Sequence, residues 1–197
     1  MDTETLRAYD ENAESFSTDW LEQPSPQDMY SLLTQHFTPG LTADVGCGAG
    51  RDVAWLNNNG FETIGYDASQ GLLEQARQHY PALRFEPAVL PELEGIGRHT
   101  FQNVLCETVI MHLDADLVGP ATRRLLDILG PGGTLFLSWR IAEGTSQRDK
   151  YQRLYSWFDE SLVLNECQSH TVLLDGVEIN ESSGKMVHRV IVRKNLF

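Results

Sequence analysis

The chain has 197 residues, of which 41% are hydrophobic and 22% are charged, as in an ordinary globular domain. It has no apolar run of about 18 residues that could span a membrane. Its formal net charge of −13 disfavours a nucleic-acid partner, because an acidic surface repels phosphate backbones. The first residues lack the basic and apolar segments of a secretory signal, and Cys47, Cys106 and Cys167 lack CxxC spacing, so we expect reduced thiols in a cytoplasmic protein.

Residues 1–38 are predicted to form a helical lead-in. Ser25 is a suitable N-cap and Pro26 fits the first helical position. Apolar residues then recur at helical spacing from Met29 to Phe37. Pro39 and Gly40 end this helix.

Residues 41–197 alternate between predicted strands and predicted helices. Seven strands are expected, over residues 41–45, 61–66, 83–86, 101–106, 134–139, 171–179 and 187–193. Helices are expected over residues 51–59, 70–80, 117–129 and 148–168. Strands that alternate with helices favour a parallel sheet, whereas the polar turn over residues 180–185 favours an antiparallel hairpin. The sequence therefore predicts a single α/β domain: a Rossmann-like, mostly parallel seven-stranded sheet with helices on both faces and a C-terminal antiparallel hairpin.

A glycine-rich loop follows the first predicted strand and opens a helix. Its glycines alternate with other residues, at Gly46, Gly48 and Gly50. Such a loop lets the backbone approach a nucleotide-like ligand, although a plain tight turn uses the same residues. A dinucleotide fingerprint would place glycine or alanine where Arg51 stands. Asp44, two residues before the first glycine, suits an ammonium or sulfonium ligand better than a pyrophosphate.

The segment Asp44-x-Gly46-x-Gly48-x-Gly50 resembles the first motif of the class I S-adenosylmethionine-dependent methyltransferases. The resemblance extends in order from about Tyr9 to Arg193. Further matching segments are Thr63–Ser69, Leu90-Pro91, Phe101–Leu113 and Leu129–Leu135. The resemblance implies S-adenosylmethionine as the cofactor and S-adenosylhomocysteine as the product.

The resemblance also implies roles for individual residues. Asp67, 21 residues after Gly46, would hold both ribose hydroxyls; the alternative is a simple acid at a helix start. Ala88 stands where the family places an acid near the adenine, so the Val89 N–H and the Leu90 side chain are expected to serve there instead. The other expected cofactor contacts are Asp44, Gly46, Cys47, Gly48, Gly50, Arg51, Ala68 and Glu107.

Six of the residues have two interpretations each. Arg51 would pair with the methionine carboxylate of the cofactor or lie on the surface. His112, in the loop after the fourth strand, would be a general base or a packed residue that orients Glu107 or closes the pocket. Arg140, just after the fifth strand, would hold an anionic substrate group or lie on the surface. The remaining three form an aromatic set that would make a lid or simply pack, namely Tyr9, Phe16 and Trp20.

The loop after the fourth strand lacks the Asn/Asp-Pro-Pro-Tyr/Phe pattern of enzymes that methylate amide or adenine nitrogens in macromolecules. Together with the acidic charge, this absence favours a small-molecule acceptor. We therefore expect a methyltransferase that is a monomer or a homodimer, does not bind membranes, and has no metal, because no His/Cys/Asp/Glu set has ligand spacing. The alternatives are a nicotinamide-dependent oxidoreductase and a non-catalytic S-adenosylmethionine-binding protein of the same fold.

Overall fold

The computed structural model describes residues 1–141 and 144–196. Its main feature is a seven-stranded sheet with the strand order β3-β2-β1-β4-β5-β9-β8. The strands are β1 (Thr42–Val45), β2 (Thr63–Asp67), β3 (Arg84–Pro87), β4 (Phe101–Cys106), β5 (Leu129–Arg140), β8 (Thr171–Ile179) and β9 (Met186–Arg193). The pairs among β1 to β5 are parallel, and β9 is antiparallel to both β5 and β8. The predicted mostly parallel sheet with a C-terminal hairpin is thus confirmed.

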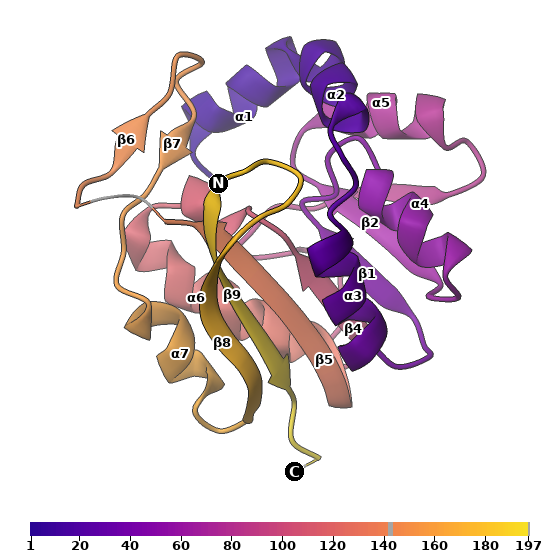
Figure 1. Ribbon diagram of the computed structural model, residues 1–197, viewed down its shortest axis with the longest axis vertical. Coiled ribbons are helices and arrows are strands. Elements are labelled where there is room, and N and C mark those ends of the chain that lie inside the picture. The colour runs from indigo at the N-terminus through magenta and orange to yellow at the C-terminus, as the bar shows by residue number, and fades with distance from the viewer. Residues whose placement is uncertain (142–143, 197) are drawn as a thin grey trace.

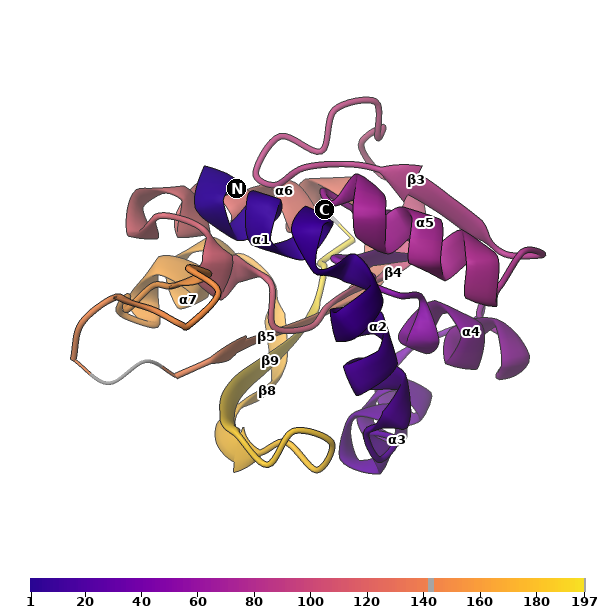
Figure 2. The ribbon, with the colours of Figure 1, turned by 90° about the horizontal axis from the view of Figure 1, so that it is seen from above.

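Helices cover both faces of this sheet (Figures 1 and 2). The lead-in forms α1 (Thr3–Glu11), α2 (Ala13–Glu22) and α3 (Gln27–His36), and the later helices are α4 (Arg51–Asn58), α5 (Gln70–His79), α6 (Ala115–Ile128) and α7 (Ser161–Cys167). Apolar side chains of α3, α4 and α5 pack against one face, and those of α6 and α7 against the other. In β5, Leu135, Phe136 and Leu137 are all fully buried, because a central parallel strand is covered on both sides.

The carboxyl ends of β1 and β4 lie side by side where the strand order reverses. Ligands of open α/β sheets bind at such a switch point. Helices α1 and α2 cross this edge of the sheet in Figure 1, and the β8–β9 turn reaches the same edge. The fold therefore gathers the lead-in, the glycine loop and the C-terminal hairpin around one opening. The assignment of residues 1–38 as a lid and 41–197 as a core stays a prediction.

Helix α3 begins one residue later than predicted. Ser25 does not cap it; Pro26 occupies the cap position and makes no side-chain cap. Instead, the Glu181 carboxylate accepts the backbone N–H of Asp28 at 3.1 Å. A residue from the β8–β9 turn therefore satisfies a helix N–H that a local cap would otherwise bind.

The predicted helix over residues 148–168 is largely wrong. That stretch contains the end of β6 (Gln147–Arg148), then β7 (Leu154–Tyr155), and only α7 at its end is helical. Asp149 Oδ1 accepts the backbone N–H groups of Tyr151 and Arg153 at 2.9 and 3.0 Å. Such a side-chain acceptor stabilises a local turn in competition with a helix. None of the described helices is long and apolar enough to cross a membrane.

Ser69 joins the lead-in to the sheet and supports one prediction. Its fully buried hydroxyl accepts the backbone N–H of Leu72 at 3.1 Å as the cap of α5, and donates to Asp10 of α1 at 2.6 Å. Replacing Ser69 with Ala should lower the free energy of unfolding by about 1–2 kcal/mol, the usual cost of a lost N-cap. Urea denaturation measures this change. The exposed Ser31→Ala in α3 is the control and should change it by less than about 0.5 kcal/mol.

Candidate functional site

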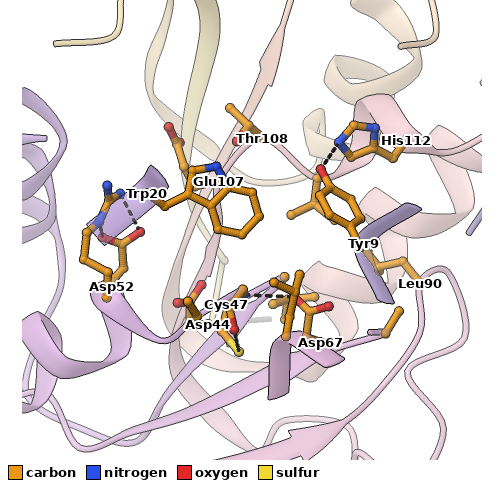
Figure 3. Close-up of a pocket in the computed structure, with 18 of the residues that line it drawn as sticks. Tyr9, Trp20, Asp44, Cys47, Asp52, Asp67, Leu90, Glu107, Thr108 and His112 are labelled. Atoms are coloured by element: carbon orange, nitrogen blue, oxygen red, sulfur yellow. Dashed lines mark hydrogen bonds and ion pairs between the residues drawn. The ribbon is translucent and has the colours of Figure 1, made fainter. Parts of the chain in front are cut away.

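A pocket opens at the carboxyl ends of β1, β2 and β4, between the glycine loop and the lead-in helices (Figure 3). It brings together most of the predicted site residues: Tyr9, Trp20, Asp44, Gly46, Cys47, Gly48, Arg51, Asp67, Ala68, Ala88, Leu90, Glu107, His112 and Arg140. Phe16, Gly50 and Val89 do not line it. Acidic side chains surround the glycine loop, whereas Tyr9 and His112 lie on the opposite side of the pocket in Figure 3.

The loop needs glycines because side chains of other residues lie close to its backbone. Gly46 has a φ of +84°, and a Cβ there would lie 2.2 Å from a Val109 methyl group. Gly48 has a φ of +53°, and a Cβ would lie 3.0 Å from the Trp20 ring. Gly50 has a different role. It is the N-cap residue of α4, its φ is +85°, and the Phe85 ring lies close to it. The loop thus keeps a bare backbone surface that faces the pocket at Gly46 and Gly48.

Asp44 presents a buried carboxylate to the pocket. The residue is 3% exposed, and its Oδ2 has no hydrogen-bond partner among the described residues. Burial and the neighbouring charges of Asp52 and Asp67 raise the pKa of Asp44 well above its ordinary value. A buried acceptor without a donor is unfavourable, so the site is suited to a ligand that brings a cationic N–H group.

Asp67, at the end of β2, supports the glycine loop. Its two oxygens accept the backbone N–H groups of Gly48 and Ser69, both at 2.9 Å. Burial raises the pKa of this carboxyl, while these backbone hydrogen bonds lower it. Each oxygen retains a free acceptor site, so the carboxylate can still bind two hydroxyl groups. It is therefore more than an acid at the start of α5.

Arg51 lies in the pocket and is not free. Its guanidinium pairs with Asp52 at 2.9 Å and donates to Ser182 of the β8–β9 turn at 3.3 Å. The Tyr30 hydroxyl donates to the same Asp52 carboxylate at 2.7 Å. This network fixes Arg51 at the rim of the pocket, and burial together with Asp52 raises the pKa of the Tyr30 hydroxyl.

Glu107, after β4, is held by two elements. It accepts hydrogen bonds from the Ser138 hydroxyl and, at 3.0 Å, from the Asn180 amide in the β8–β9 turn. Burial raises the pKa of Glu107, whereas the Ser138 hydrogen bond lowers it. The C-terminal hairpin is therefore part of the pocket wall.

Only some of the residues predicted to contact the adenine line the pocket. Ala88 and Leu90 line it, but Val89, which is 39% exposed, does not. Ala68 lines the same side. Leu90 is buried, so this wall is apolar, as expected where the acid is replaced by Ala88.

His112 has protein partners on both ring nitrogens. Nδ1 lies 2.5 Å from the Leu154 carbonyl, which can only accept, so Nδ1 carries the proton. Nε2 then accepts from the Tyr9 hydroxyl at 2.8 Å (Figure 3). Burial lowers the pKa of His112 to about 4, so the ring is neutral near pH 7. His112 does not contact Glu107, and its geometry is that of a residue that holds Tyr9.

The aromatic lid residues form one cluster. Phe16 stacks on Trp20 at 5.6 Å between ring centroids and meets Tyr9 edge-on at 5.4 Å. The Arg153 guanidinium lies 4.6 Å from the centroid of Phe16 and donates to the Tyr9 hydroxyl at 3.3 Å. Tyr9 and Trp20 face the pocket, and Phe16 supports them from behind.

Comparison with known proteins identifies a methyltransferase domain in this chain. Residues 43–133 match a family described as a methyltransferase domain. The chain therefore carries a methyltransferase domain, as its resemblance to the class I S-adenosylmethionine-dependent methyltransferases predicts. The matched residues include the glycine loop, Asp67 and His112, and they end at the entry to β5.

Several solved structures of methyltransferases share the fold of this chain. A Burkholderia thailandensis 1,6-didemethyltoxoflavin-N1-methyltransferase, solved with 1,6-didemethyltoxoflavin and S-adenosylhomocysteine, is 21% identical, with a TM-score of 0.74 over 96% of this chain and 88% of that one. Methyltransferases from Methanosarcina mazei and Mesorhizobium loti are 14% and 16% identical, with TM-scores of 0.73 and 0.71. They cover 85% and 87% of this chain, and 99% and 98% of their own. No curated protein sequence matches the chain significantly.

Several pocket residues of this methyltransferase were not predicted: Met1, Leu6, Leu21, Gln23, Asp52, Leu72, Thr108, Val109, Asn180, Ser182 and Ser183. Asp52 and Thr108 are adjacent to predicted residues and could have been found by extending the motifs. Asn180, Ser182 and Ser183 come from a polar turn whose contacts with the loop are too distant in sequence to leave a local pattern. Among the described residues, no group of three or more His, Cys, Asp or Glu is placed to hold a metal ion.

Proposed function

We propose that this methyltransferase binds S-adenosylmethionine in the pocket and transfers its methyl group to a small-molecule acceptor by in-line displacement. The observation that carries the proposal is the buried carboxylate of Asp44, which lines the pocket and whose Oδ2 has no hydrogen-bond partner among the described residues. The cofactor carries an ammonium group that would supply the missing donor. The bare backbone at Gly46 and Gly48, both of which line the pocket, suits the same ligand because no side chain there separates it from the backbone.

Different residues of the pocket would bind different parts of the cofactor. Asp44 would hold the ammonium group, Arg51 the carboxylate, and Asp67 the two ribose hydroxyls. Ala88 and Leu90 would form the apolar wall for the adenine. When bound, S-adenosylmethionine supplies a methyl carbon that bonds to the acceptor's lone pair as the carbon–sulfur bond breaks, leaving S-adenosylhomocysteine. The protein contributes proximity and orientation, because the methyl group is already activated.

We propose that the acceptor lies against Tyr9, Trp20 and His112. A small molecule fits this side of the pocket because the lead-in helices cover it. His112 is a positioning residue, since both of its nitrogens are bound within the protein. The Tyr9 hydroxyl is the group that it presents to the acceptor. Burial raises the pKa of Tyr9, so this hydroxyl stays protonated.

The neutral state of His112 can be tested without knowing the acceptor. The His112 ring should titrate near pH 4, because burial opposes its positive charge. An NMR pH titration of the ring protons measures this pKa. In Tyr9→Phe the pKa should rise, because the hydrogen bond to Nε2 that favours the neutral ring is lost. The partly exposed His36 serves as an internal reference. Titration of His112 near 6.5 in the wild-type protein would contradict the positioning role.

Calorimetry with S-adenosylhomocysteine and with NADH tests the cofactor. We expect binding of S-adenosylhomocysteine and none of NADH; binding of NADH alone would overturn the proposal in favour of an oxidoreductase. A panel of small-molecule acceptors with radiolabelled S-adenosylmethionine tests the reaction. Cofactor binding with no transfer to any acceptor would favour a non-catalytic binding protein.

A further inference from the structure

A groove leads outward from the pocket at the end of β5. Arg140 lines both the pocket and the groove, and Arg148, Asp149, Tyr155 and Lys185 line the groove alone. Three of these side chains are cationic and one is anionic. In a chain with a net charge of −13, such a local excess of positive charge is unusual.

The charges of the groove are not all compensated. Arg148 forms two hydrogen bonds with Asp2, both at 2.9 Å, and Asp149 pairs with Arg153. Within residues 1–141 and 144–196, neither Arg140 nor Lys185 has a carboxylate at ion-pair distance. The Arg140 Nε is buried and has no hydrogen-bond partner in the same residues. Among the described residues, nothing therefore neutralises these two positive charges, and they are available to a ligand.

Arg140 is also held in place. It ends β5, its backbone N–H contacts the Met111 sulfur at 3.4 Å, and its guanidinium lies 5.9 Å from the centroid of the Tyr155 ring. The positive charge reaches the acceptor side of the pocket, because Arg140 and Arg153 both help to lower the pKa of His112. The pocket thus has an acidic end at Asp44 and a basic end at Arg140.

We propose that the methyl acceptor carries an anionic group, a carboxylate or a phosphate, which Arg140 binds with Lys185 nearby. This inference rests on the proposed function, because it places an acceptor in the pocket beside the cofactor. A guanidinium binds planar oxyanions through paired N–H donors, and such an anion would satisfy the unpaired Nε. The opposite charges of the two ends would also keep the cofactor's ammonium group and the acceptor's anion apart.

Three ring compounds of similar shape test this inference in the presence of saturating S-adenosylhomocysteine: benzoate, phenyl phosphate and benzamide. NMR titration gives the dissociation constant of each. At least one anion should bind about tenfold more tightly than neutral benzamide. The preferred anion identifies a carboxylate or a phosphate. Equal binding of all three compounds would overturn the proposal.

Variants assign the effect to the residue. Arg140→Gln should weaken binding of the preferred anion about tenfold and leave benzamide unchanged, and Arg140→Lys should lose less. Arg123→Gln changes an exposed arginine of α6 that is paired with Glu166 of α7; it is the matched control and should change neither. Unchanged anion binding in Arg140→Gln would overturn the proposal. Binding of S-adenosylhomocysteine is measured separately, so loss of the proposed function would be recognised by itself.

Discussion

Replacing Asp67 with Ala should weaken the binding of S-adenosylhomocysteine by roughly 5- to 150-fold, which corresponds to about 1–3 kcal/mol. Two effects contribute. The variant loses the charge-assisted hydrogen bonds that we assign to the ribose hydroxyls. It also leaves the backbone N–H groups of Gly48 and Ser69 without their acceptor, so the glycine loop is no longer fixed for the ligand. Isothermal titration calorimetry measures the dissociation constant.

Two further variants separate these effects. Asp67→Asn keeps one oxygen for the backbone and should retain more affinity than Asp67→Ala. Glu86→Ala removes the same charge from the neighbouring strand β3, where the Glu86 side chain pairs with exposed Arg84, and it should change the affinity by less than about twofold. Thermal unfolding without ligand checks that each variant is folded. An unchanged affinity in Asp67→Ala would show that the ribose assignment is wrong.

Much of the fold follows from local patterns in the sequence. The buried strands are short apolar runs bounded by glycine, proline or polar residues. Their side chains are covered on both faces of the sheet. The glycine loop is equally local, because Gly46, Gly48 and Gly50 stand at fixed spacing between a strand and a helix. The spacing of Asp67 is also local, because one βαβ unit separates it from the loop. These features could be predicted without knowledge of tertiary contacts.

Other features depend on residues that are distant in sequence. The stretch from Arg148 to Gln168 has apolar residues at helical spacing, but Asp149 folds it into a turn and Arg153 packs among aromatic rings. The partners of His112 are Tyr9 and the Leu154 carbonyl, 103 and 42 positions away. Its position after the fourth strand left both a base and a packed residue open, and from these contacts we infer a positioning role. Sequence could place His112 but not its neighbours.

Replacing Asp44 with Asn should produce two opposite effects. The affinity for S-adenosylhomocysteine should fall by roughly 10- to 100-fold, because the amide cannot form an ion pair with the ammonium group. The ligand-free protein should become more stable, because the variant removes a buried carboxylate whose Oδ2 has no partner among the described residues. Calorimetry measures the first effect, and urea denaturation of the ligand-free protein measures the second.

The stability gain of Asp44→Asn should depend on pH. Burial raises the pKa of Asp44 above its ordinary value of 3.8, so the folded state holds this proton more tightly than the unfolded state. The stabilisation is fully present below pH 3.8 and is lost as the pH rises through the raised pKa. Wild type therefore loses stability over that range relative to Asp44→Asn, and the difference between them should widen. A difference that is constant with pH would contradict the raised pKa.

Asp52→Asn is the matched control, because it removes the same charge from the same pocket. Asp52 is paired with Arg51 and accepts from Tyr30, so its loss leaves a largely buried guanidinium without its partner. Removing one member of such a pair is destabilising, and Asp52→Asn should therefore lower the stability of the ligand-free protein. If Asp44→Asn raises the stability of the ligand-free protein and Asp52→Asn lowers it, Asp44 serves to bind a ligand although it destabilises the folded protein. If both variants were destabilised, Asp44 would be a structural residue, and the assignment of the ammonium site would fail.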